Sequence, residues 1–233
     1  MQVTCETWKD GQWVITHELM RVRFEHSAYN SPDGLILMGS SDYPGNIKTV
    51  MLEKDAVVGD DVPDTHGSYD LPYGVAAQCA IPEPDTNTVV LTGDQVARFG
   101  QGGLLAYLPN LNQNRREHAC GGYNDADGNK VMLVAGGWLG GSDIIDSVEI
   151  RVGDGDAPWV YSTPLPFQSQ GNRIANLGNV LYHMGGINGN GIYKWEANSK
   201  EWIHLDDIIS PRWKHAVSVI TVDDSILDFC FGK

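Results

Sequence analysis

Short apolar segments that end in glycine recur along the chain, and this repetition constrains the fold more than any other feature. The segments GLILMG, TVVLTG, KVMLVAGG and NVLYHMGG end at Gly39, Gly93, Gly137 and Gly186. They lie roughly 50 residues apart, a period at which repeated units stack on one another. Because one unit cannot bury its apolar residues alone, the repeat predicts several small sheets that pack side by side.

The glycine pair in KVMLVAGGWLGG has two interpretations. A phosphate-binding loop needs a helix directly after its glycines. The segment that follows, SDIIDSVEIRV, alternates and is rich in Ile and Val, which predicts a strand instead. We therefore expect Gly136 and Gly137 to be packing residues, placed where a Cβ atom would collide with a neighbouring backbone.

Composition and charge narrow the class of protein. The chain has 27 Gly and 7 Trp among 233 residues and lacks long helical segments, which favours an all-β domain rich in turns. Its net charge of -14 disfavours nucleic acids and anionic membranes as partners. No apolar run approaches the roughly 20 residues of a membrane helix, and the first residues show no secretory signal.

Two further patterns recur with the glycines. An Arg three residues before a His occurs in RFEH, RREH and RWKH, that is at Arg23 and His26, Arg115 and His118, and Arg212 and His215. Tryptophans follow the later strands of a unit, at Trp13, Trp159 and Trp202.

Together these features resemble the kelch repeat, and the chain is similar to kelch-type propellers, including the central domain of galactose oxidase. The resemblance implies an all-β fold whose four-stranded sheets, the blades, pack radially around a channel. Two units depart from the pattern because GSSDYPG and GDQVARFG keep one glycine each. A third, around GNRIANLGNVLY, lacks the His.

The resemblance covers residues 1–233 as a single domain and predicts a five-bladed propeller. Inner strands are expected at EHSAYN, AAQCAI, EHACGGY, NRIANL and KHAVSVI. The blades are then approximately 24–73, 74–110, 115–165, 170–208, and a composite of 212–230 with 1–17. Pairing the N-terminal and C-terminal strands in one composite blade closes the ring and removes exposed sheet edges.

The four cysteines fall into two pairs in this arrangement. Cys5 and Cys230 face each other across the closure, while Cys79 and Cys120 share a register in adjacent inner strands. Each is a disulfide candidate, and the alternative that they are small buried hydrophobic residues stays open. Paired cysteines would place the protein in an extracellular, oxidising compartment, and unpaired ones in the cytoplasm.

Histidines and acidic loops offer no convincing metal site. His26, His118 and His215 repeat in register, which favours a structural hydrogen-bonding role. The loop NDADGNK begins like a calcium loop, but Gly136 stands where such a loop needs a Glu, so we expect a turn. Residues 55–70 are interpreted as a solvated acidic loop. The Tyr–Cys crosslink of a galactose-oxidase copper centre has no evident counterpart, and we predict neither a metal nor another cofactor.

A rim of arginines is the candidate ligand-binding site. It comprises Arg23, Arg115, Arg116, Arg173 and Arg212, all near the starts of the inner strands. Guanidinium groups suit carboxylates, so an acidic peptide or an anionic glycan, such as a sialylated one, is the expected ligand. In the alternative interpretation, each Arg pairs with an acid such as Glu25 or Glu117.

The sequence therefore predicts a monomeric, non-enzymatic scaffold that binds a protein or a glycan through its loops. No Gly-x-Ser-x-Gly elbow or His-Glu-x-x-His helix occurs, and no catalytic residue is identified. The alternative is a glycan- or small-molecule-processing enzyme of the epimerase, lyase or oxidase kind, because a fold does not fix a function.

Overall fold

The described residues form an all-β structure with strands β1 to β18 and one short 3-10 helix, η1 (Pro84–Thr86). The computed structural model describes residues 4–9, 12–18, 27–31, 34–42, 45–53, 69–70, 78–86, 88–100 and 103–217. Within these ranges, no helix is long and apolar enough to cross a membrane. The predicted all-β class is confirmed.

Consecutive strands form antiparallel sheets, as expected for units that fold locally. The first sheet contains β3 (Ser27–Ser31), β4 (Gly34–Asp42), β5 (Gly45–Glu53) and β6 (Tyr69–Asp70). The second contains β7 (Cys79–Glu83), β8 (Thr88–Thr92), β9 (Val96–Gly100) and β10 (Gly103–Leu108). The third contains β11 (Ala119–Asn124), β12 (Lys130–Trp138), β13 (Ile144–Val152) and β14 (Val160–Ser162). The fourth contains β15 (Arg173–Leu177), β16 (Val180–Met184), β17 (Gly191–Glu196) and β18 (Glu201–Asp207). Strands β1 (Thr4–Lys9) and β2 (Gln12–Glu18) pair separately.

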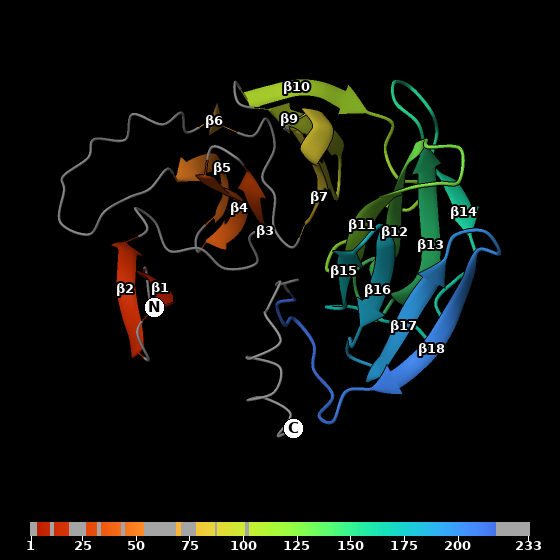
Figure 1. The fold of residues 1–233 in the computed structure, drawn as a ribbon. Coiled ribbons are helices and arrows are strands. Elements are labelled where there is room, and N and C mark those ends of the chain that lie inside the picture. The colour runs from red at the N-terminus through yellow and green to blue at the C-terminus, as the bar shows by residue number, and fades with distance from the viewer. Residues whose placement is uncertain are drawn as a thin grey trace.

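The sheets are arranged side by side through their first strands. Strand β3 contacts β7, β7 contacts β11, and β11 contacts β15. Figure 1 shows the sheets following one another along an arc, from the red β1 and β2 to the blue β18. This is a β-propeller-like arrangement, with first strands inside and last strands outside.

The core lies between neighbouring sheets, and β12 shows why. Its segment from Val131 to Ala135 is buried on both faces. Met132 and Val134 pack with residues of the second sheet, whereas Leu133 packs with residues of the fourth. A continuous apolar run is what a strand buried on both sides requires.

The glycine pairs let successive units approach closely, as predicted. Both Gly136 and Gly185 have positive φ, 65° and 62°. A Cβ atom on Gly136 would lie 2.5 Å from the carbonyl oxygen of Ser169, and one on Gly185 would lie 2.7 Å from that of Arg212. The second glycine of each pair donates its N–H to the same carbonyl, at 2.7 and 2.9 Å. The pairs therefore join each unit to the next.

A disulfide links the second and third sheets at their inner strands. Cys79 of β7 and Cys120 of β11 are bonded, with an S–S distance of 2.04 Å and a Cα–Cα distance of 5.8 Å. This confirms one of the two predicted pairs. Cys230 lies outside the described residues, so the Cys5–Cys230 pair stays a prediction.

His118 has the structural role expected from its repetition. Its Nε2 is hydrogen-bonded to Thr92 Oγ1 of the preceding sheet at 2.8 Å. Complete burial, with a smaller contribution from neighbouring arginines, lowers the pKa of His118 to about 3, so the ring is neutral. The fourth sheet lacks this His and uses Asn172, whose Nδ2 donates to Ala135 O at 3.2 Å. His26 lies outside the described residues.

The NDADGNK loop is a hairpin turn, as predicted. Asp125 follows β11, and its Oδ1 accepts hydrogen bonds from the N–H groups of Asp127 and Asn129, at 3.0 and 2.8 Å. The side-chain amide of Asn129, which donates to Asp125 Oδ2 at 3.1 Å, lowers the pKa of Asp125 most, and these backbone bonds lower it further, which is the behaviour of an Asx turn. The acidic loop at 55–70 lies mostly outside the described residues.

Candidate functional site

Three successive segments, 115–118, 169–172 and 212–215, share one backbone structure at one end of the sheets. We call this end the mouth. Their third residues, Glu117, Gly171 and Lys214, have φ values of 53°, 63° and 53°. Gly171 N donates to Glu117 O, and Lys214 N donates to Gly171 O, both at 2.7 Å. The segment after β18 therefore continues the series that leads into β11 and β15.

Arg115 is buried beneath the mouth. Only 1% of its surface is exposed, and its Nη2 forms an ion pair of 2.5 Å with Glu149 Oε1. Its Nη1 donates to Gly136 O and Ser147 O, at 3.1 and 2.8 Å. Burial lowers the pKa of Arg115, and the charge of Glu149 opposes that effect. The structure thus places Arg115 among structural ion pairs, away from an exposed rim, because its donors are used within the third sheet.

Arg116 is exposed and pairs with an acid of the preceding sheet. Its Nη2 lies 3.0 Å from Asp94 Oδ2, and about half of each side chain is exposed. This matches the alternative interpretation of the rim, although the partner is neither Glu25 nor Glu117.

Arg173 and Arg212 differ from the other rim arginines because neither forms an ion pair within residues 78–217. Arg173 is partly buried and donates from Nη1 to Asn172 O at 2.8 Å. Its burial lowers its pKa, against the attraction of Glu117. Arg212 is exposed. Burial lowers the pKa of His215 most, and the positive charges of Arg173 and Arg212 lower it further. The three residues therefore form one basic cluster.

Two polar side chains complete the cluster. Lys214 Nζ lies 2.6 Å from Glu117 Oε1. In the described part of the chain, Glu117 Oε2 and both ring nitrogens of His215 are buried without a hydrogen-bond partner. An unpaired buried polar group costs about 1–3 kcal/mol, so these atoms of Glu117 and His215 are unfavourable as they stand in the described part of the chain. Arg23 lies outside the described residues.

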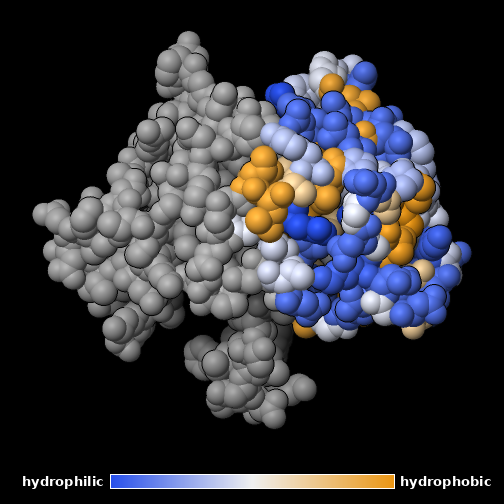
Figure 2. Space-filling view, turned by 90° about the horizontal axis from the view of Figure 1, so that it is seen from above, coloured by the Kyte–Doolittle hydropathy of each residue, from blue (hydrophilic) through white to orange (hydrophobic). Residues whose placement is uncertain are grey.

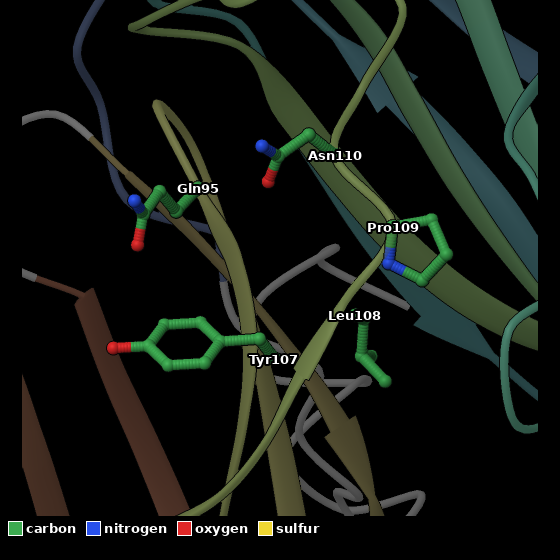
Figure 3. Close-up of a pocket in the computed structure, with 5 residues that line it drawn as sticks. All are labelled: Gln95, Tyr107, Leu108, Pro109 and Asn110. Atoms are coloured by element: carbon green, nitrogen blue, oxygen red, sulfur yellow. The ribbon is translucent and has the colours of Figure 1, made fainter.

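A hollow elsewhere in the described residues is lined by no charged side chain. It has a volume of about 430 Å³ and is lined by Gln95, Tyr107, Leu108, Pro109 and Asn110. Figure 3 shows these side chains around the end of β10 and the turn after β8. Asn110 Oδ1 accepts the N–H of Val96 at 3.1 Å. This hollow lies between two loops of the second sheet, and its lining has no cationic side chain for an acidic ligand.

The described part of one face of the molecule is mainly polar. Figure 2 shows hydrophilic residues over most of the described part of one face, with apolar residues in compact groups. Exposed apolar side chains include Leu105 on β10 and Tyr161 on β14.

Sequence reasoning missed Lys214 and Asp94 as members of the mouth. Lys214 occupies the position directly before the repeated His, so aligning the three segments would have found it. Asp94 could not be found by such an alignment. It directly follows Gly93 in GDQVARFG, a unit that keeps only one glycine of the repeated pair.

Comparison with known proteins supports the fold. No family model matches the sequence, and no curated protein matches it. Solved structures do match, among them the structure of YjhT, with 12% sequence identity and a TM-score of 0.67. The match covers 89% of this chain and 77% of that chain. At this identity the likeness shows the fold alone, and the chain therefore shares the all-β architecture of that structure.

Proposed function

We propose that the protein is a kelch-like, five-bladed propeller in which residues 212–230 and 1–17 form the fifth blade. Strands β1 and β2 provide two strands that belong to none of the four-stranded sheets. Residues 212–215 return to the mouth as the two earlier segments do. Deleting residues 1–17 should therefore remove the hydrogen-exchange protection of residues 218–230. Unchanged protection in the deleted protein would contradict the closure.

We infer that the propeller is a binding scaffold whose mouth takes an acidic ligand, either a peptide or an anionic glycan. The observation that carries this proposal is the pair Arg173 and Arg212: neither forms an ion pair within residues 78–217, although Glu117 attracts Arg173 and the whole chain has a net charge of -14. A guanidinium group presents two parallel N–H donors to a carboxylate. Partial burial of Arg173 reduces competition from water, which strengthens such a bond.

Because salt screens distant charges, an acidic ligand is expected to bind only where it directly contacts Arg173 and Arg212. At ionic strengths near 0.15 M, charges more than about 8 Å apart are largely screened. The acidic body then repels an acidic ligand weakly, while Arg173 and Arg212 attract it at contact distance. Binding at the mouth is therefore expected to weaken as salt is added.

Titration calorimetry with an oligoglutamate peptide and with a sialic-acid-capped oligosaccharide tests this proposal. Arg173→Gln should weaken ligand binding by about tenfold or more, because a partly buried charge pair loses one member, and Arg212→Gln should weaken it less, because Arg212 is exposed. Lys130→Gln is the control, since Lys130 pairs with Asn124 at the end of β11 away from the mouth and belongs to neither site. Equal affinities in all four proteins would refute the role of the mouth.

A second candidate function is acid–base processing of a glycan or small molecule. It is favoured by His215, whose two ring nitrogens have no hydrogen-bond partner in the described part of the chain. The lowered pKa of His215 keeps the ring neutral at pH 7 and able to accept a proton. If His215→Gln abolishes turnover of a bound ligand while its affinity is retained, the enzyme proposal gains support.

The disulfide bears on the compartment. The Cys79–Cys120 bond is compatible with an extracellular location, where such bonds persist. We propose that the protein is secreted and acts as a monomer. Secretion predicts no free thiol at Cys79 or Cys120 in protein isolated from its source, and light scattering measures the mass in solution.

A further inference from the structure

A second hollow lies beside the mouth, between the second and third sheets. Its volume is about 310 Å³, at the lower end of the range for small-molecule sites. It is lined by Asp94, Asn114, Arg115, Arg116, Trp138, Leu139 and Gly140.

The charged side chains that are accessible in this hollow neutralise each other. Asp94 and Arg116 form the ion pair at 3.0 Å, and each is about half exposed. One carboxylate oxygen and one guanidinium nitrogen make the contact, so the carboxylate still accepts hydrogen bonds and the guanidinium still donates them. The exposed amide of Asn114 adds both a donor and an acceptor. Such a lining suits a ligand with many hydroxyl groups and no charge.

Trp138 is held in place at the wall of the hollow. Its backbone pairs with that of Arg116, with N···O distances of 3.0 and 2.8 Å. Its indole Nε1 donates to Gly141 O at 3.0 Å. The indole donor is thus occupied by the protein, and the ring offers a ligand its apolar surface. Leu139, 41% exposed, extends that surface.

We propose that this hollow binds one uncharged saccharide residue, with its C–H face on Trp138 and its hydroxyls on Asp94, Arg116 and Asn114. Arg116 is adjacent in the chain to Glu117, which contacts Lys214 at the mouth. A glycan that carries an acidic sugar next to a neutral one would occupy both places. This step rests on the proposed function and names its ligand as a glycan in preference to an acidic peptide.

Two glycans separate the inference from the proposed function: an oligosaccharide capped by an acidic sugar, and the same oligosaccharide without the cap. Calorimetry with each should show Trp138→Ala weakening both by a similar factor, about fivefold or more. Arg173→Gln should weaken only the capped one. Trp138→Phe keeps an aromatic face but loses the bond to Gly141, so it should retain most of the affinity and shows that the turn itself is not the cause.

The outcomes are distinct. If Trp138→Ala binds both glycans as the unchanged protein does, the saccharide site is refuted, whatever Arg173→Gln shows. If Trp138→Phe loses as much affinity as Trp138→Ala, stacking on the ring is refuted. If Trp138→Ala weakens both glycans and Arg173→Gln weakens neither, the saccharide site stands and the acidic mouth fails. Tighter, Trp138-independent binding of oligoglutamate would identify a peptide ligand and overturn the inference.

Discussion

Replacing Arg115 with Ala should destabilise the protein far more than replacing its neighbour Arg116. The change leaves the carboxylate of Glu149, which has no exposed surface, buried without its cation. Removing one member of a buried ion pair typically costs 3–5 kcal/mol. Glu149 keeps the N–H donors of Asn112 and Gln113, at 2.7 and 3.1 Å. We therefore expect a loss near the lower end, about 3 kcal/mol.

Arg116→Ala is the internal control because the two residues are adjacent and differ mainly in burial. The side chains of Arg116 and Asp94 are 48% and 47% exposed, and exposed pairs contribute about 0–1 kcal/mol. Urea unfolding measures both changes. With a slope of about 3 kcal/mol per molar urea, Arg115→Ala should lower the unfolding midpoint by about 1 M.

The double change Arg115→Met with Glu149→Leu provides the second comparison. It removes both charges, so it should destabilise less than Arg115→Ala alone. The reasoning is wrong if Arg115→Ala and Arg116→Ala shift the midpoint equally, or if Arg115→Ala lowers only ligand affinity.

Three further predictions concern the frame. Changing Cys79 and Cys120 to Ala opens a loop with a separation of 41 residues, and chain entropy predicts a loss of about 4 kcal/mol, measurable by urea unfolding. Gly136→Ala should destabilise more than Gly128→Ala in the same assay. Both glycines have positive φ, but only at Gly136 does a Cβ atom meet a backbone oxygen, so equal losses would show that the close approach is unimportant. The unfolded chain binds a proton at His118 with a pKa of 6.5 and the folded chain only near 3. His118 should therefore contribute a fall in stability as the pH drops below 6.5, by up to about 1.4 kcal/mol per pH unit. His118→Asn should make the profile between pH 4 and 7 less steep by that amount and leave the similar contribution of His183, whose pKa is also lowered to about 3.

The repeated features of the fold were predictable because they follow from backbone geometry. Gly136 must avoid a neighbouring carbonyl, and Cys79 and Cys120 share a register, so periodicity locates them. The same pattern could not predict which arginines are buried against an acid and which are exposed. Arg115 finds a buried acid on β13, whereas Arg212 occupies the corresponding position after β18 and is exposed. Only the packing of the sheets decides which of them has a partner.

The left-handed residue in each of the three mouth segments has a consequence for which side chains the mouth can carry. Glu117, Gly171 and Lys214 make their shared bonds through backbone N–H and C=O groups alone, so no side chain takes part in these bonds. Glu117 carries an anionic side chain, Gly171 carries none, and Lys214 carries a cationic one. Substitutions at Glu117 and Lys214 can therefore change the charge of the mouth one position at a time, at a conformational cost of about 1–2 kcal/mol for any residue other than glycine. At Gly171 a Cβ atom would lie 2.9 Å from the backbone nitrogen of Lys214, so that position is closed to other side chains.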